Sequence, residues 1–493
     1  MLRGARGADD QILRPRAEIV LLALCLAAYL GWLQTRTPYL IGLSSYVQGY
    51  QAQVLLGRRQ PAPAVADLHR HRPQRLTQIV TAAALRLAPD ETRGVKAAAW
   101  AMGLFALLAF WSLLRGLGVR WAWLYIALLL AAGERFMLEL LAASPDVLNL
   151  ALLAALARSL LGRRRWPVVV WATLLGWNTS WAPILTLGLW AATRWARPGE
   201  AQRAMLGSAL LPAALAILVS GPHVLANVIG IGVQIEALAR AWLQPLSCWT
   251  IEEFDPIEIR ALLLGPGALW CLLVPALGLA VAGRLPTAQR APALAALGAL
   301  VLATLRVSLE ARGFIFLVPA AACLAALVFD GLDARLRRWA LAAVGLCVLA
   351  GGAGTWSHVL PRLGGLLNGP EPYIEGTRWL EQRSERGAVV LATGLGEAEV
   401  LGFLSGHNRF VALGDPAALA AASPARANAW QGLRRGQVAR MAALCNDVFD
   451  ADWLFADKTR IEMHRRVQND IYLLQGWQAR EFGIYRAARQ KTR

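Results

Sequence analysis

Long apolar runs separated by short polar segments dominate the first three quarters of the chain. Such runs predict membrane-spanning helices, because a bilayer core about 30 Å thick needs about 20 apolar residues in a helix. The pattern predicts about eleven of these helices, several shorter than a perpendicular span needs. They fall at 17–33, 97–114, 121–133, 147–161, 166–177, 181–193, 205–220, 258–283, 291–305, 313–329 and 339–356.

Arginine-rich segments follow this helix order in a regular way. Five of them fall on the same side as the basic N-terminus, namely 115–120, 158–165, 194–203, 284–290 and 330–338. Cytoplasmic loops carry such an excess of basic residues, so this side is expected to be cytoplasmic. The opposite side receives a long first loop, 34–96, and everything after about residue 357. The first loop is itself basic, although basic residues are expected mainly in cytoplasmic loops. Its arginines therefore need a local explanation, such as a bound ligand.

The character of the chain changes after the glycine-rich stretch 351–354. Alternating patterns predict helices at 371–383, 397–406 and 459–474, and strands at 387–393, 409–415, 451–458 and 482–487. Alternating strands and helices indicate a small α/β domain on the outer, periplasmic face. The predicted fold class is therefore mainly α: a polytopic membrane helical bundle, residues 1–360, followed by a periplasmic α/β domain, residues 361–493.

Composition supports a membrane protein and excludes several soluble classes. The chain is 57% hydrophobic and only 17% charged, and its mean hydropathy is +0.43. The net charge of +18 would suggest nucleic acid in a soluble protein, but no compact basic domain with interleaved aromatics is present, so no nucleic-acid partner is expected. Walker, Rossmann and nucleophilic-triad signatures are absent, as is the cysteine spacing of a zinc site.

The first outer loop holds the densest cluster of candidate chemistry. Asp67, His69, His71 and Arg72 lie within six residues, in a segment that also contains two further arginines. A metal site is one reading of this HxH spacing, although no clear further ligand is present. A solvated loop is the simplest reading. Arginine also binds phosphate oxygens with its planar fork, so contact with a lipid phosphate is the third reading.

Acidic and aromatic residues also occur in the other outer segments. Ser144-Pro145-Asp146 opens a helix, where proline suits the first position and a carboxylate favours the positive helix end. Glu134 lies just before it, between two spans, where a charge must face water or a partner. Glu310 and Arg312 lie at the outer mouth of a span that contains Pro319. Trp249, in a later outer loop, suits the membrane interface or a sugar ring.

The order of these pieces resembles the GT-C superfamily of polyprenyl-phosphate-sugar-dependent glycosyltransferases. It is most similar to bacterial relatives of protein O-mannosyltransferases and of the enzymes that add aminoarabinose to lipid A. The resemblance rests on the juxtamembrane segment 46–57, on His71-Arg72-Pro73, on Ser144-Pro145-Asp146, and on the pattern from Glu310 to Pro319. The resemblance in architecture covers nearly the whole chain. It is based on the order of the motifs and on their location on the same side of the membrane.

The resemblance implies transfer of a sugar from a polyprenyl-phosphate donor to a cell-envelope acceptor: a glycolipid, a polysaccharide or a protein. It implies an inner-membrane enzyme with a cytoplasmic N-terminus, in contact with membrane lipids. Such chemistry needs a carboxylate for the acceptor proton and cations for the phosphate. No cofactor is assigned, and a divalent metal stays open.

Proposed contacts with substrate follow from the same resemblance. They are Tyr46, His69, His71, Arg72, Asp146, Trp249, Glu310 and Arg312.

The sequence departs from the family pattern at one place. Members usually carry an acid just after the first span, where this chain has Ser44-Ser45. Serine is no general base near neutral pH without its own activator. Asp67 and Glu134 are therefore the expected catalytic acids. The alternative is a catalytically degenerate scaffold or lipid-binding partner in an envelope assembly complex. A transporter would require mid-span charges and repeat symmetry, and neither is apparent.

Overall fold

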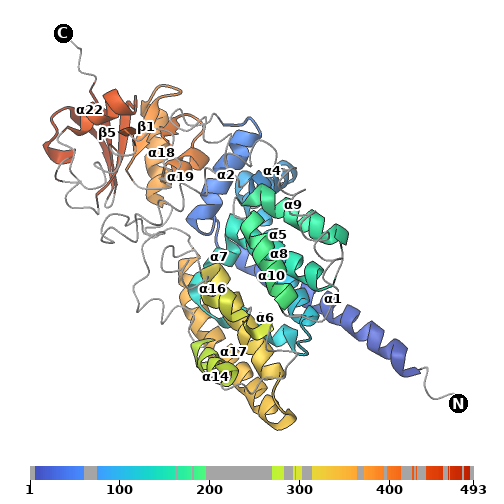
Figure 1. The fold of residues 1–493 in the computed structure, drawn as a ribbon. Coiled ribbons are helices and arrows are strands. Elements are labelled where there is room, and N and C mark those ends of the chain that lie inside the picture. Colours follow the sequence, from blue (N-terminus) through green and yellow to red (C-terminus); the bar gives the residue numbers. More distant parts are fainter. Residues whose placement is uncertain are drawn as a thin grey trace. The chain divides into compact units, whose positions relative to one another are not determined.

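The structure is a computed structural model of the 493-residue chain. It describes residues 6–59, 75–162, 165–179, 182–195, 269–281, 292–294, 296–301, 314–363, 371–393, 397–411, 425–426, 429, 440–458, 465, 467–479 and 482–488. These residues form mainly helices and one small sheet (Figure 1). They fall into two compact units. Unit 1 comprises 1–38, 96–221 and 252–363; unit 2 comprises 39–95, 222–251 and 364–493.

Unit 1 is a bundle of helices, most of which coincide with predicted apolar segments; α7 is the exception, because its residues were expected to lie between two spans. Its members are α1 (Arg6–Thr35), α5 (Glu91–Gly116, from Lys96 on), α6 (Ala122–Ala131), α7 (Glu134–Leu141), α8 (Pro145–Leu161), α9 (Arg165–Asn178), α10 (Ala182–Trp195), α14 (Leu269–Val281), α16 (Phe314–Asp330) and α17 (Ala334–Arg362). Residues 292–294 and 296–301 are also helical. Segment 205–220 lies outside the described residues. The mainly helical prediction is therefore confirmed.

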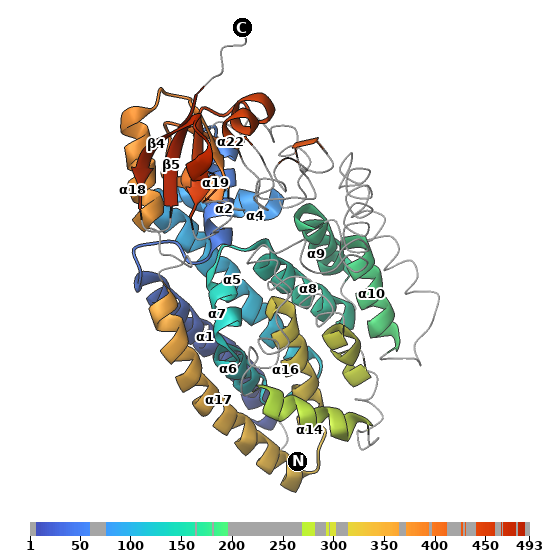
Figure 2. The same cartoon turned by 90° about the vertical axis from the view of Figure 1, so that its left-hand side faces the viewer.

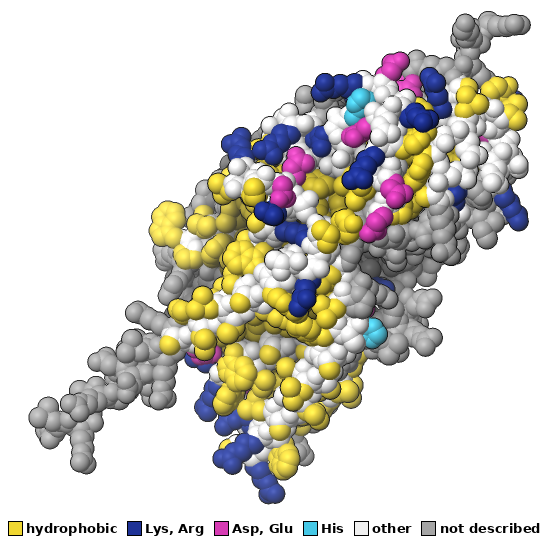
Figure 3. All heavy atoms as spheres, turned by 180° about the vertical axis from the view of Figure 1, so that it is seen from behind, with side chains coloured by type: hydrophobic (Ala, Val, Ile, Leu, Met, Phe, Trp, Pro, Cys, Tyr) yellow, Lys and Arg dark blue, Asp and Glu magenta, His cyan; other side chains and the backbone are white. Residues whose placement is uncertain are grey.

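Helices long and apolar enough to cross a membrane are part of this bundle. Within the described part of the chain there are three, Ala17–Thr35, Glu91–Gly116 and Ala334–Leu360, and a fourth if the pair α7 and α8, bent by 92°, counts as one span. The outer faces of α1 and α17 expose large apolar side chains such as Leu24, Leu346 and Leu349. Figure 3 shows hydrophobic side chains spread over this surface and basic ones gathered at its lower end. The number of eleven spans stays a prediction.

Three of the five arginine-rich segments meet at one end of unit 1. The backbone N–H of Arg120 donates to the Asp330 carboxylate over 3.3 Å, which joins segments 115–120 and 330–338. A Cβ on Gly116 would lie 2.5 Å from Cδ of Arg158, so the third segment lies there too. Arg115 also pairs with Glu18 of α1 at 3.9 Å. The prediction that these segments share one side thus agrees with the packing of the described helices.

α1 and α17 meet near the C-terminal ends of both helices, and Figure 2 shows both helices in unit 1. The Trp32 ring stacks on the Trp356 ring with centroids 4.9 Å apart, and the Arg36 guanidinium lies 4.3 Å from the Trp32 centroid. Thr355 donates to the carbonyl oxygen of Ala131 over 3.0 Å, so the end of α17 also meets the end of α6. These contacts lie at the end opposite to the arginine-rich one.

Unit 2 combines two helices of the first loop with a five-stranded sheet. The helices are α2 (Leu43–Leu55) and α4 (Arg75–Leu87). The sheet has the order β2-β1-β3-β5-β4, with β1 (Val389–Ala392), β2 (Arg409–Val411), β3 (Trp453–Asp457), β4 (Leu473–Gln478) and β5 (Phe482–Ala487). β1 pairs in parallel with β2 and β3, whereas β5 pairs antiparallel with β3 and β4.

Short helices complete this part of the chain. α18 (Glu371–Arg383) precedes β1 and buries Tyr373 and Leu380, and α19 (Glu397–Leu404) connects β1 to β2. α22 (Met441–Ala443) runs into the π-helix η3 (Leu444–Val448), which buries Cys445 in the sheet's core. The predicted α/β character of this region is confirmed. The division of the chain at residue 360, and the periplasmic location, stay predictions.

One strand was not predicted. Residues 459–474 were expected to be helical, but Leu473 and Leu474 belong to β4, opposite Ala487 and Arg486. The Asp470 carboxylate accepts from the backbone N–H of Tyr472 over 3.1 Å and so turns the chain away from a helix. β4 lies at the edge of the sheet and exposes most of its side chains, so its sequence lacks the apolar alternation that signals a half-buried strand.

Replacing Gly103 of α5 with alanine is expected to destabilise unit 1. The added Cβ would lie 2.8 Å from the carbonyl oxygen of Leu140, which cannot yield unless α7 moves. Overpacking of this kind costs about 1–3 kcal/mol. The matched control is Gly354→Ala in α17, whose Cβ meets no described atom within 4 Å.

The measurement is thermal unfolding in detergent, followed by tryptophan fluorescence. G103A should lower the midpoint, whereas G354A should leave it level or raise it, because alanine favours helices over glycine by about 1 kcal/mol. Equal midpoints for the two variants would contradict the close approach of α5 and α7.

Candidate functional site

Asp146 is a buried carboxylate at the beginning of α8. Ser144 is the N-cap of this helix, and its hydroxyl accepts from the backbone N–H of Asp146 over 3.3 Å. Pro145 occupies the first turn, as the sequence predicted, since its ring already has a helical φ and the missing N–H is not needed there. Asp146 is 8% exposed. The positive end of the helix dipole stabilises a negative charge at this position.

A network of buried amides fixes the first turn of α8. Asn178, at the end of α9, donates to the Pro145 carbonyl oxygen over 3.0 Å and to Oδ1 of Asn149 over 2.9 Å. Asn178 is fully buried and Asn149 is 6% exposed. An unpaired buried amide is costly, so these bonds hold α8 and α9 in one register. The carboxylate of Asp146 is therefore carried on a rigid turn.

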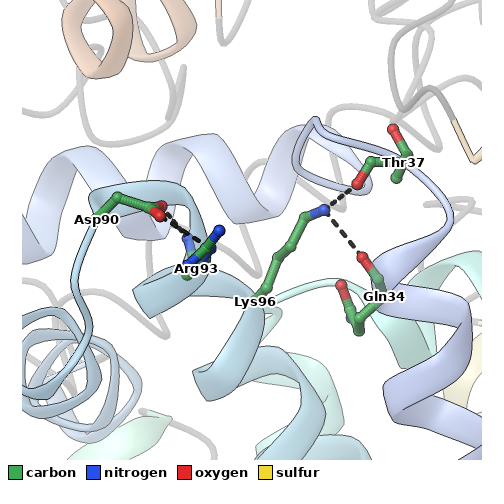
Figure 4. Close-up of polar contacts among 5 residues, drawn as sticks. All are labelled: Gln34, Thr37, Asp90, Arg93 and Lys96. Atoms are coloured by element: carbon green, nitrogen blue, oxygen red, sulfur yellow. Dashed lines mark hydrogen bonds and ion pairs between the residues drawn. The ribbon is translucent and has the colours of Figure 1, made fainter.

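The segment just before α8 is tied to the first helix of the bundle. The side-chain amide of Gln34, near the end of α1, donates to the carbonyl oxygen of Leu141 over 2.6 Å. The carbonyl oxygen of Gln34 itself accepts from Nζ of Lys96 over 2.9 Å, and the carbonyl oxygen of Thr37 accepts from the same ammonium group (Figure 4). One lysine of α5 thus holds the end of α1, which in turn holds the end of α7.

Glu134 begins α7, after Gly133, whose φ of 148° lies in a region that side chains rarely adopt. The side chain of Glu134 is half-buried, as is that of Glu139 on the same helix. α7 is bent by 92° from α8, so the two carboxylates precede a sharp change of direction in unit 1. The structure thus describes Glu134 and Asp146 on consecutive helices, twelve residues apart along the chain.

Tyr46 lies on α2 in unit 2 and is 2% exposed. Burial raises the pKa of its hydroxyl above the usual value, so Tyr46 is a neutral donor rather than a base. Ser44 and Ser45 occupy the same helix and are also buried. The Ser45 hydroxyl donates to the carbonyl oxygen of Ile41 over 2.6 Å. Its proton is therefore engaged by the backbone, which gives Ser45 a structural role in this helix.

The remaining predicted site residues lie outside the described residues. They are Asp67, His69, His71, Arg72, Trp249, Glu310 and Arg312. Their assignment stays a prediction.

The sequence leaves a divalent metal open. Around the beginning of α8 the identified polar groups are one carboxylate, one hydroxyl and two amides. Within the described part of the chain, no three His, Cys, Asp or Glu side chains come together as a metal site.

Sequence reasoning missed Gln34, Lys96, Asn149 and Asn178. A signal for two of them existed: Asn149 lies inside an apolar run and Asn178 ends another. Polar side chains at membrane depth usually face a partner or a functional cavity. Their mutual pairing could not be predicted, because Asn178 and Asn149 are 29 residues apart.

Comparison with known proteins finds similar folds among solved structures but no matching sequence family. No protein-family model and no curated protein matches the chain. Among solved structures, ArnT from Cupriavidus metallidurans in the apo state is similar with a TM-score of 0.56 and 12% identity, over 97% of this chain and 100% of that chain. Its structure with bound undecaprenyl phosphate gives 0.56 and 12%, over 96% and 99%.

The oligosaccharyltransferase of Archaeoglobus fulgidus in the apo form is similar with a TM-score of 0.58 and 13% identity, over 95% of this chain and 75% of that one. These neighbours are GT-C glycosyltransferases. The resemblance to this superfamily is therefore confirmed at the level of the fold, along nearly the whole chain.

Replacing Lys96 with methionine is expected to lower the free energy of unfolding by about 1–3 kcal/mol, because it leaves the carbonyl groups of Gln34 and Thr37 without this donor. The matched control is Arg93→Ala, three residues earlier. Arg93 pairs with Asp90 at 3.1 Å, but its side chain is 74% exposed (Figure 4). Exposed pairs contribute about 0–1 kcal/mol.

Denaturant or thermal unfolding of the purified protein in detergent measures both variants. A larger loss for R93A than for K96M would show that Lys96 does not hold the end of α1.

Proposed function

We propose that the protein is an integral membrane glycosyltransferase that moves a sugar from a polyprenyl-phosphate donor to a hydroxyl group of a cell-envelope acceptor. The observation that carries this proposal is the buried carboxylate of Asp146. It lies at the beginning of α8 in a largely apolar bundle, on a turn fixed by Asn178 and by Gln34. Charged side chains inside apolar bundles usually face water, a partner group or a substrate and mark functional sites, and this bundle has the GT-C fold.

The proposed reaction exchanges one bond for another at the anomeric carbon. The acceptor oxygen attacks that carbon, its proton passes to a carboxylate, and the bond to the phosphate oxygen breaks, which releases polyprenyl phosphate. A phosphate is already a good leaving group, so the protein must mainly orient the acceptor and balance the charge on the phosphate.

Three acids divide this work in the proposal. Asp146 faces the sugar and orients it, and Asp67 or Glu134 accepts the proton of the acceptor. His71, Arg72 and Arg312 are the proposed partners of the phosphate, because guanidinium groups match its oxygens. His69, Glu310, Trp249 and Tyr46 complete the proposed contacts with substrate, with Tyr46 as a neutral hydrogen-bond donor.

The ligands in the solved neighbours support the donor class. One ArnT structure contains undecaprenyl phosphate, and one structure of the archaeal oligosaccharyltransferase AglB contains a dolichol phosphate and an inhibitory peptide. Apolar faces of α1 and α17 supply a lipid-facing surface. The proposed location is a bacterial inner membrane, with the arginine-rich end of unit 1 in the cytoplasm and the C-terminal sheet in the periplasm.

A second candidate is a catalytically degenerate relative that binds lipid or serves as a scaffold in an envelope assembly complex. The observation in its favour is at Ser44-Ser45, where the family's usual acid is replaced. The Ser45 hydroxyl donates a hydrogen bond to the backbone carbonyl oxygen of Ile41, just before α2, so it is not set up as a base. This candidate predicts binding of polyprenyl phosphate without transfer.

Transfer assays on carboxylate variants test the proposal. The purified protein in nanodiscs would receive a panel of undecaprenyl-phosphoryl sugars with an envelope lipid fraction as acceptor, and the release of undecaprenyl phosphate would be measured. Asp146→Asn should lower the rate about 100-fold, because a misplaced substrate costs about that factor. Either Asp67→Asn or Glu134→Gln should do the same.

The control variant is Asp90→Asn, because Asp90 is exposed and pairs only locally with Arg93. It should retain the wild-type rate. If D67N and E134Q both retain full transfer, the base assignment is wrong. If no sugar of the panel is transferred while undecaprenyl phosphate still binds, the scaffold reading replaces the enzyme.

A further inference from the structure

α2 and α19 lie against each other in unit 2, although about 350 residues separate them along the chain (Figures 1 and 2). Their contact is built from two glycine–aromatic pairs, Gly49-Tyr50 on α2 and Gly402-Phe403 on α19. A Cβ on Gly49 would lie 2.7 Å from Cε2 of Phe403. A Cβ on Gly402 would lie 2.8 Å from Cε2 of Tyr50. Each helix thus supplies a glycine where the other places an aromatic ring.

The same contact reaches Tyr46 of α2, one of the proposed substrate contacts. The Phe403 ring packs edge-to-face on the Tyr46 ring, with centroids 5.7 Å apart and an interplanar angle of 85°. Tyr46 precedes Tyr50 by four residues, so both rings lie on one face of the helix. Tyr46, Tyr50 and Phe403 are all at least 95% buried. A shift of α19 would therefore displace Tyr46 directly.

Charged groups surround the Tyr50 end of the contact. Burial is the main cause that raises the pKa of Tyr50, and the carboxylate of Glu399 on α19 raises it further, whereas Arg59 and Arg409 oppose this. Glu399 is 1% exposed. Arg59 also donates to Oε1 of Gln53 over 3.2 Å, so the end of α2 shares this charged surrounding. Apolar and electrostatic contacts thus coincide on the same two helices.

We infer that α19 is a positioning element for α2: the C-terminal sheet region holds the first-loop helix, and with it Tyr46, through the reciprocal glycine–aromatic contact. Gly49, Gly402, Tyr50 and Phe403 are the positioning residues. The role of α19 in sugar transfer rests on the proposed function, whereas its role in fixing the position of α2 does not. The sheet region would then be a required part of the transferase rather than an appendage.

A double-mutant cycle at Gly402 and Tyr50 tests the inference without reference to activity. Gly402→Ala forces a methyl group against the Tyr50 ring, and Tyr50→Ala removes that ring. Hydrogen exchange of the α2 amides, residues 43–55, should speed up about tenfold in G402A, as expected for overpacking. Exchange in α17 should stay unchanged. The double variant G402A/Y50A should exchange more slowly in α2 than the two single effects combined predict.

Gly354→Ala is the control for a helical glycine with open space around it and should leave exchange in α2 as in the wild type. Unchanged exchange in G402A, or effects of G402A and Y50A that simply add, would overturn the contact as the element that holds α2.

Transfer kinetics then separate positioning from mere stability. If the wild type transfers sugar, G402A should lower kcat about tenfold at a temperature where the protein stays folded, with KM for the donor changed less. Faster exchange in α2 with unchanged kcat and KM would overturn the positioning role while the proposed function stands. If the wild type transfers no sugar, the proposed function fails, and the exchange cycle alone decides whether α19 holds α2.

Discussion

Backbone carbonyl groups at the ends of helices must find donors, and this constraint shapes the end of unit 1 where α1, α7 and α8 meet. In an apolar bundle an unpaired carbonyl group costs several kcal/mol, since no bulk water reaches it. Here Lys96 donates to two carbonyl groups at the end of α1, and Gln34 donates to one at the end of α7. Asn178 adds a hydrogen bond to the Pro145 carbonyl group at the beginning of α8, where carbonyl groups also accept within the helix. The site of Asp146 depends on these three donors, because they fix the segment that carries it.

The opposite end of unit 1 obeys a different constraint. Arg115, Arg120 and Arg158 come together there with the acidic groups Glu18 and Asp330. Between the two ends the helices present apolar side chains to their surroundings, most clearly along α1 and α17. The described helices of unit 1 thus form a bundle with a basic end, an apolar middle and a polar end, the layout of a helical membrane protein.

Local signals in the sequence predicted much of this. The apolar runs placed the helices, and Ser144-Pro145 placed the start of α8, because capping and proline geometry depend on neighbouring residues alone. Three arginine-rich segments, 115–120, 158–165 and 330–338, correctly predicted helix ends that meet, whereas 284–290 and most of 194–203 lie outside the described residues. The sequence did not predict the pairing of Lys96 with Gln34, 62 residues away, or the contact of α2 with α19. Such contacts are set by tertiary packing, as is the edge strand β4, whose exposed side chains lack a strand pattern.

The central claim is that the carboxylate of Asp146 faces a lipid-linked sugar. A photoreactive polyprenyl-phosphate analogue with a diazirine close to its phosphate tests this most directly, with mass spectrometry to locate the adducts. The account predicts adducts within residues 141–149 that disappear when undecaprenyl phosphate competes. Adducts confined to the exposed face of α17, or adducts that undecaprenyl phosphate does not displace, would contradict it.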